Sequence, residues 1–228
     1  MNPHKKLIYS NKITSFFCNP IIKLLGIRVS SNINRENLPA NKNYLFVSNH
    51  LSYLDIFILS SYCPAVFIAS VDQVKSNPIL GKATELSGSL FVDRQNRGNI
   101  QEELQTIKSA FSMGANLVLF PEGTTSNGEK VLQFKSSFLA LAENNSIDVL
   151  PLAIKYKKIN DNPVNSDNRD YIYYYGDMSF FPHFFRFLYI KSIDVELNFL
   201  DVIVSDTNYS RKELALHTYS AISSAYAQ

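Results

Sequence analysis

The chain has 228 residues, of which 46% are hydrophobic and 18% are charged, and its formal net charge is +2. This length and composition fit one globular domain with a sizeable core, and the small net charge argues against a dedicated nucleic-acid-binding protein. Two cysteines are too few for a disulfide framework. The sequence has no recognisable secretory signal peptide and no apolar run long enough to span a membrane. We therefore expect a reducing, cytoplasmic setting.

Residues 1–25 are basic and apolar, and the first acidic residue of the chain is Glu36. A segment of this kind can lie in the headgroup layer of an anionic bilayer. The alternative is a helix that packs on the domain's own core and leaves its lysines in water. Pro20 interrupts the segment, so two short helices are as consistent with it as one. We predict a membrane-interfacial segment at 1–25, a single domain at 26–228, and a peripheral protein on the cytoplasmic face of a membrane.

Short apolar runs alternate with amphipathic segments between residues 26 and 156. The expected strands are 26–33, 44–48, 65–69, 89–92, 116–120 and 148–156, and the expected helices are 52–62, 78–87, 99–113 and 131–144. The turn at 39–43 allows the first two strands to pair as a hairpin. The alternation predicts an α/β fold, a mixed and mostly parallel sheet flanked by helices.

The last third of the chain is less regular. A polar loop at 157–170 precedes expected strands at 171–175 and 192–200, and a capping box at Ser210 and Glu213 begins a final helix. Residues 180–189 are dense in aromatic side chains. They suit an acyl tunnel, a contact with lipid or a buried core helix.

His50 stands where the strand 44–48 ends and a helix begins, and Asp55 follows five residues later. Open α/β sheets bind their ligands at strand ends. A neutral imidazole can take a proton near pH 7, and a fixed carboxylate can orient it. However, Ser52-x-x-Asp55 is also a capping box, in which Asp55 only starts the helix and His50 is a loop residue.

Further polar sites fall at strand ends or within a strand of the same sheet, at 93–94, 121–124 and 150–151. The planar fork of Arg94 suits a phosphate or a carboxylate, although an ion pair with Asp93 explains it equally well. Gly123 lets the backbone approach a ligand and Thr124 adds a hydroxyl, whereas the alternative is an ordinary turn. The remaining histidines do not have the spacing of metal ligands.

The residues singled out above fall in four blocks, at 49–55, 88–94, 120–124 and 149–151. In order and spacing, these blocks resemble the four blocks of the glycerolipid acyltransferase family, the family of the 1-acyl-glycerol-3-phosphate acyltransferases. The resemblance runs from Gly26 to Tyr156, more than half of the chain.

The resemblance implies transfer of a fatty acyl group from a thioester, acyl-CoA or acyl-carrier protein, to the free hydroxyl of a lysolipid, without a cofactor or metal ion. The expected acceptor is 1-acyl-glycerol-3-phosphate, which would give phosphatidic acid. His50 would be the general base, Asp55 would orient it, and Pro151 would lie near the acyl chain. The residues expected to hold the acceptor's head group are Arg94, Glu122, Gly123 and Thr124.

The chain departs from the family pattern at Thr125, where arginine is common, and at 69–70, where a lysine is usual. The threonines of 120–126 and the stretch 176–178 look like a branch that includes lyso-ornithine lipid acyltransferases, whose acceptors carry no phosphate. This is the alternative acceptor. A serine hydrolase would need a Gly-x-Ser-x-Gly elbow, and a nucleotide-dependent enzyme would need a glycine-rich phosphate loop; the sequence has neither. The alternative from another class is a lipid-binding module without turnover.

Overall fold

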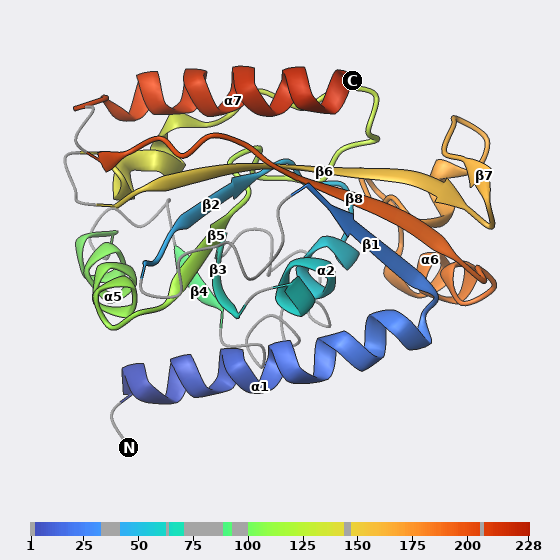
Figure 1. The fold of residues 1–228 in the computed structure, drawn as a ribbon, viewed down its shortest axis with the longest axis horizontal. Coiled ribbons are helices and arrows are strands. Elements are labelled where there is room, and N and C mark those ends of the chain that lie inside the picture. The colour runs from blue at the N-terminus through green and yellow to red at the C-terminus, as the bar shows by residue number, and fades with distance from the viewer. Residues whose placement is uncertain are drawn as a thin grey trace.

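The computed structural model describes residues 3–32, 42–62, 64–70, 89–92, 100–143, 147–205 and 208–228 (Figure 1). The expected helix at 78–87 and the predicted binding residue Arg94 lie outside these ranges.

One eight-stranded sheet forms the centre of the described chain. Its strands are β1 (Ile27–Ser31), β2 (Leu45–Ser48), β3 (Ala65–Ser70), β4 (Leu90–Val92), β5 (Asn116–Leu119), β6 (Val149–Ile159), β7 (Asn162–Pro163) and β8 (Ile193–Phe199). The order is β1-β8-β6-β2-β5-β3-β4, and β7 pairs with β6. β6 pairs antiparallel with β7 and β8, and the other neighbours are parallel. The predicted fold class, a mixed and mostly parallel sheet with flanking helices, is confirmed.

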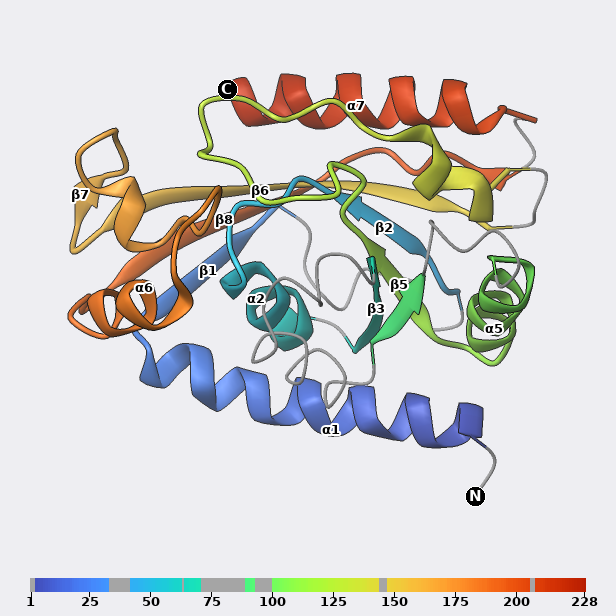
Figure 2. The ribbon, with the colours of Figure 1, turned by 180° about the vertical axis from the view of Figure 1, so that it is seen from behind.

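Helices cover both faces of the sheet. They are α1 (Pro3–Leu24), α2 (Leu54–Tyr62), α5 (Ile100–Ser112), α6 (Phe180–Phe187) and α7 (Arg211–Ala227), with 3₁₀ helices η2 (Ser136–Leu141) and η3 (Arg169–Tyr171). α7 packs with η2 on one side, and α1 packs on α2 on the other (Figures 1 and 2). In the described chain, no helix combines the length and the apolar character needed to span a membrane.

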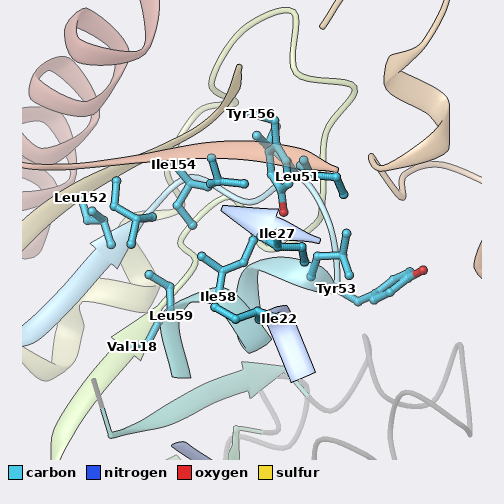
Figure 3. Packing of buried hydrophobic residues seen from close by; sticks show 14 of the residues in the cluster. Ile22, Ile27, Leu51, Tyr53, Ile58, Leu59, Val118, Leu152, Ile154 and Tyr156 are labelled. Atoms are coloured by element: carbon cyan, nitrogen blue, oxygen red, sulfur yellow. The ribbon is translucent and has the colours of Figure 1, made fainter. Parts of the chain in front are cut away.

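The core lies on both faces of β2. Leu45 and Val47 belong to one buried cluster and Phe46 to the other, the pattern of a central strand covered on both sides. In the cluster that contains Phe46, Ile58 of α2 packs near Ile154 of β6 (Figure 3). Burying one such side chain fully contributes about 1.5–3 kcal/mol. This packing fixes α2, and so the turn that leads into it.

The expected hairpin between 26–33 and 44–48 is wrong. β1 instead pairs in parallel with β8, with Ile27 opposite Ile193. β2 already has β5 and β6 as its two neighbours, so neither of its edges is open to β1.

Two other expected elements also differ. The helix expected at 131–144 is reduced to η2, and the Lys135 N–H, which would bond to the Val131 carbonyl in that helix, donates to the Pro121 carbonyl at 2.9 Å. The strand expected at 171–175 is irregular after η3, and the Tyr174 N–H donates to the Leu51 carbonyl at 3.0 Å. In both cases the backbone bonds to the turn at strand ends instead of to its own element.

α1 is one helix, and it continues through the exposed Pro20. Cys18 and Ile22 are buried on its inner face, so the packed-helix alternative holds for that face. Its outer face exposes Phe16 and Leu24, the latter to 87%. The interfacial role of residues 1–25 stays a prediction. At the other end of the chain, the expected capping box of α7 is present.

Candidate active site

The turn that carries His50 begins with an anchored asparagine. The side chain of Asn49 accepts the Ile154 N–H at 2.8 Å and donates to the Ile154 carbonyl at 2.9 Å. These bonds imitate the backbone of a strand and extend the pairing of β2 with β6 by one residue. A buried side-chain amide needs a partner for its oxygen and for its nitrogen. These two bonds therefore also fix the direction in which the turn leaves the sheet.

His50 and Asp55 are in direct contact. Nδ1 of His50 lies 2.8 Å from Oδ2 of Asp55, which is fully buried. The same oxygen accepts the N–H groups of Leu51 at 2.7 Å and Ser52 at 3.0 Å. The other oxygen, Oδ1, accepts the hydroxyl of Tyr156 at 2.7 Å. Four donors around one carboxylate hold it in a single orientation, and the ring of His50 with it.

The capping arrangement exists together with this contact. Ser52 Oγ accepts the Leu54 N–H at 3.3 Å, while Asp55 accepts the Ser52 N–H. The start of α2 therefore uses the same carboxylate that meets the imidazole. Asp55 therefore takes part in the start of α2 and also orients the ring of His50.

The imidazole of His50 lies flat on Phe120. The ring centroids are 4.0 Å apart and the planes differ by 9°. The side chain remains 13% exposed. With Nδ1–H assigned as the donor to Asp55, a neutral ring carries its lone pair on Nε2. Among the described residues none bonds to Nε2, so this nitrogen can accept a proton from another molecule.

The 121–126 turn meets His50 from the adjacent strand β5. Glu122 is buried; its Oε1 accepts the His50 N–H at 2.7 Å and its Oε2 accepts the Leu132 N–H. The Ser126 N–H donates to the His50 carbonyl at 3.0 Å. Burial raises the pKa of Glu122 to about 7, although both N–H bonds act in the opposite direction. Histidine and turn thus form one hydrogen-bonded unit.

Gly123 leaves room for a cation beside this unit. Its φ is +71°, and a Cβ there would lie 2.9 Å from Nζ of Lys135 and 3.2 Å from the ring of Phe138. Lys135 is exposed, and among the described residues it has no ion-pair partner. Thr124 is exposed next to it. A backbone turn, a hydroxyl and an ammonium group can together meet an anionic group.

A family model described as Acyltransferase matches residues 30–155. This chain belongs to the acyltransferase family. A lyso-ornithine lipid O-acyltransferase of Rhizobium meliloti is 34% identical over 199 residues, which are 84% of this chain and 67% of that protein. A 1-acyl-sn-glycerol-3-phosphate acyltransferase of Neisseria gonorrhoeae is 29% identical over 172 residues, 74% of this chain and 65% of that protein. The predicted resemblance is confirmed, and the chain is an acyltransferase of the kind that serves lipid biosynthesis.

A solved structure has the same fold as this acyltransferase. It is the 1-acyl-sn-glycerophosphate (LPA) acyltransferase PlsC from Thermotoga maritima, with a TM-score of 0.68 at 22% identity. The match covers 100% of this chain and 83% of that one.

The acyltransferase brings together most of the residues that the sequence singled out. His50 and Asp55 touch, and Glu122 bonds to the backbone of His50 with Gly123 beside it. Pro151 is buried within the sheet, in register with Val47, three residues before His50. Its expected place beside the acyl chain stays a prediction, as does the role of Arg94.

Sequence reasoning missed three contacts of the acyltransferase site. Phe120 stacks on the ring, Tyr156 holds Asp55, and Lys135 reaches Gly123. Phe120 directly precedes the 121–126 turn, so the sequence could have predicted its position next to the site. Tyr156 lies 101 residues from Asp55, and no local pattern marks it.

Proposed function

We propose that this acyltransferase moves a fatty acyl group from an acyl thioester, acyl-CoA or acyl-carrier protein, to the free hydroxyl of a lysolipid. The observation that carries the proposal is the 2.8 Å contact between His50 Nδ1 and Asp55 Oδ2, with Nε2 left to accept a proton. The non-catalytic lipid-binding alternative has no use for an oriented base.

His50 is the general base in this proposal. Nε2 takes the proton of the lysolipid hydroxyl while the oxygen attacks the thioester carbonyl. The carbon–sulfur bond then breaks, and the thiolate leaves with the proton that His50 returns. The imidazolium formed on the way faces the carboxylate of Asp55. A positioned base supplies about 10²–10⁴-fold in rate, and the ordering of the two substrates supplies more.

The head group of the acceptor is assigned to the Gly123 side of the 121–126 turn. Both oxygens of Glu122 accept backbone N–H groups, so we assign this residue to the shape of the turn. Gly123 and Thr124 then offer backbone and hydroxyl groups to the acceptor, and Lys135 offers a charge. Arg94 and Pro151 keep their predicted roles toward the head group and the acyl chain.

Two acceptors fit this arrangement. One is 1-acyl-glycerol-3-phosphate, and a named relative acts on it. The other is lyso-ornithine lipid, named for the Rhizobium meliloti relative. Thr125, where arginine is common in the family, favours the second, because a phosphate needs more fixed positive charge than the carboxylate of an ornithine head group.

A panel of acceptors tests the proposal. Purified protein is given one labelled acyl thioester, as acyl-CoA or as acyl-carrier protein, with each lysolipid in turn. Free thiol and the mass of the lipid product are measured. We expect thiol release that requires an acceptor and one product that carries the label. Equal release without an acceptor would indicate a hydrolase, and no release with any pair would favour a binding module.

We also propose that the protein is peripheral on the cytoplasmic face of a membrane and that the outer face of α1 contributes to the contact. Phe16 and Phe17 are exposed there, with Lys12 and Lys23 along the same helix. Deleting residues 1–25 would also remove the buried Cys18, so Phe16→Ser with Phe17→Ser is the cleaner change. We expect weaker sedimentation with anionic vesicles; unchanged sedimentation would contradict a role for α1.

A further inference from the structure

α6 has two contrasting faces. His183 and Phe187 are buried on the inner face. On the outer face Phe181 and Phe185 are exposed to 54% and 58%, and the chain continues through the exposed Leu188 and Tyr189. We call Phe181, Phe185, Leu188 and Tyr189 the aromatic ridge. Exposed apolar side chains that gather in this way mark an interaction surface, whereas single ones need no explanation.

The inner face of α6 holds the turn that carries His50. The hydroxyl of Tyr53, in the middle of that turn, lies 3.1 Å from Nδ1 of His183. The ring of Tyr53 also meets Phe180 edge-on at 5.4 Å. Whatever surface receives the aromatic ridge is therefore one helix diameter away from the catalytic turn.

The ridge adjoins the exposed end of α1. The Gly26 carbonyl, directly after α1, accepts the Ile193 N–H at 3.0 Å, a few residues after the ridge. Leu24 is exposed on the α1 side of this junction. Figures 1 and 2 show α6 and α1 on the side of the sheet opposite α7. The two exposed apolar faces thus belong to one side of the molecule.

Within its own stretch of the chain, the ridge is accompanied by charges of one sign. The sequence has no acidic residue between Asp177 and Asp194, and Arg186 and Lys191 are exposed within that stretch. Residues 1–35 also lack acidic side chains. Aromatic side chains flanked by basic ones suit the headgroup layer of an anionic bilayer.

We propose that the aromatic ridge of α6 inserts into the headgroup layer of an anionic lipid bilayer and presents the catalytic turn to that surface. This inference rests on the proposed function, because an acceptor that is a lipid gives the catalytic turn a reason to face a bilayer. The contact itself does not depend on turnover and can be measured without an acyl donor. A second copy of the chain is the competing occupant of the ridge.

Vesicle sedimentation of the full chain tests the contact. The variant is Phe181→Ser with Phe185→Ser, and the control is Leu216→Ser, an exposed leucine of α7 on the opposite side of the sheet. We expect the ridge variant to partition onto vesicles with anionic lipid about tenfold more weakly, while the control binds as the unchanged protein does. Equal binding of all three proteins would overturn the proposal.

A fluorescent reporter keeps the test valid if the double variant folds poorly. The chain has no tryptophan, so Phe185→Trp and Leu216→Trp each carry a single indole. With anionic vesicles the emission of Phe185→Trp should shift to the blue, and that of Leu216→Trp should stay. No shift for Phe185→Trp would overturn the proposal. So would a blue shift without lipid that follows protein concentration, because it would identify a second copy as the occupant.

Discussion

Two histidines near the catalytic turn have opposite environments. His183 is fully buried, and both of its nitrogens are engaged, Nδ1 with the Tyr53 hydroxyl and Nε2 with the Tyr173 carbonyl at 2.9 Å. Within the part of the chain that the structure describes, His50 is bonded only through Nδ1 of its ring, and the partner is a carboxylate. Burial lowers the pKa of His183, which favours the neutral ring. A histidine with two neutral partners can only hold structure, whereas one with a carboxylate and an open nitrogen can also carry a proton.

The largest effect that separates these two environments is expected from Asp55→Asn. The amide cannot stabilise the imidazolium as a carboxylate does, so we expect kcat to fall about 10³-fold. The variant also weakens the start of α2, which should lower the melting temperature. Rate per folded molecule separates the two consequences. A lower melting temperature with an unchanged kcat would mean that Asp55 only caps the helix.

His183→Phe should have the reverse outcome. It leaves the Tyr53 hydroxyl and the Tyr173 carbonyl without their partner, which should cost about 1–3 kcal/mol in the free energy of unfolding. The rate of the folded fraction should stay within about twofold, a change too small for a catalytic group. Denaturant unfolding and active-site-normalised rates measure both. A large loss of kcat at full stability would place His183 in the chemistry.

The same histidine gives the stability a pH dependence. Because its pKa is lowered from 6.5 in the folded protein, the unfolded chain binds more protons as the pH falls through that value. The contribution of neutral His183 is present above pH 6.5 and is lost at lower pH. The unfolding free energy of the unchanged protein should therefore fall more steeply than that of His183→Phe on acidification. Parallel curves would contradict this.

A smaller effect is expected from Tyr156→Phe. Burial raises the pKa of Tyr156, so its hydroxyl stays protonated and donates to Asp55 Oδ1. Without this donor, one fewer hydrogen bond orients the carboxylate, and the imidazole is held less precisely. We expect kcat to fall about tenfold at an unchanged KM. A kcat equal to that of the unchanged protein would mean that Tyr156 is only a packing residue.

The smallest effect concerns Glu122→Gln. Since the pKa of Glu122 is raised to about 7 from 4.5, the folded protein binds a proton that the unfolded chain has lost between those values. This contribution is complete below pH 4.5 and disappears as the pH rises through 7. The stability of the unchanged protein should therefore decline relative to the glutamine variant from pH 5 to 8. If the two proteins differed in unfolding free energy by the same amount at every pH, burial would not raise the pKa of Glu122.

Features that depend on hydrophobic periodicity and on the order of residues along the chain could be predicted from the sequence. The buried runs at 44–48 and 116–120 became β2 and β5, and the proximity of His50 to the 121–126 turn followed from their adjacency. Prediction from the sequence failed where contacts between distant residues decide the local structure. The Lys135 N–H donates to the Pro121 carbonyl and not to the Val131 carbonyl, as it would in the helix expected at 131–144. Tyr156 reaches Asp55 only through the fold of β6 over α2, and no spacing encodes that contact.

In the proposed mechanism His50 accepts a proton, while its neighbours hold it in position. Acyl transfer by His50→Ala, measured together with the melting curve of the variant, tests this role. We expect a rate at least about 10³-fold lower at a nearly unchanged melting temperature. Transfer close to that of the unchanged protein, with the same product, would contradict it.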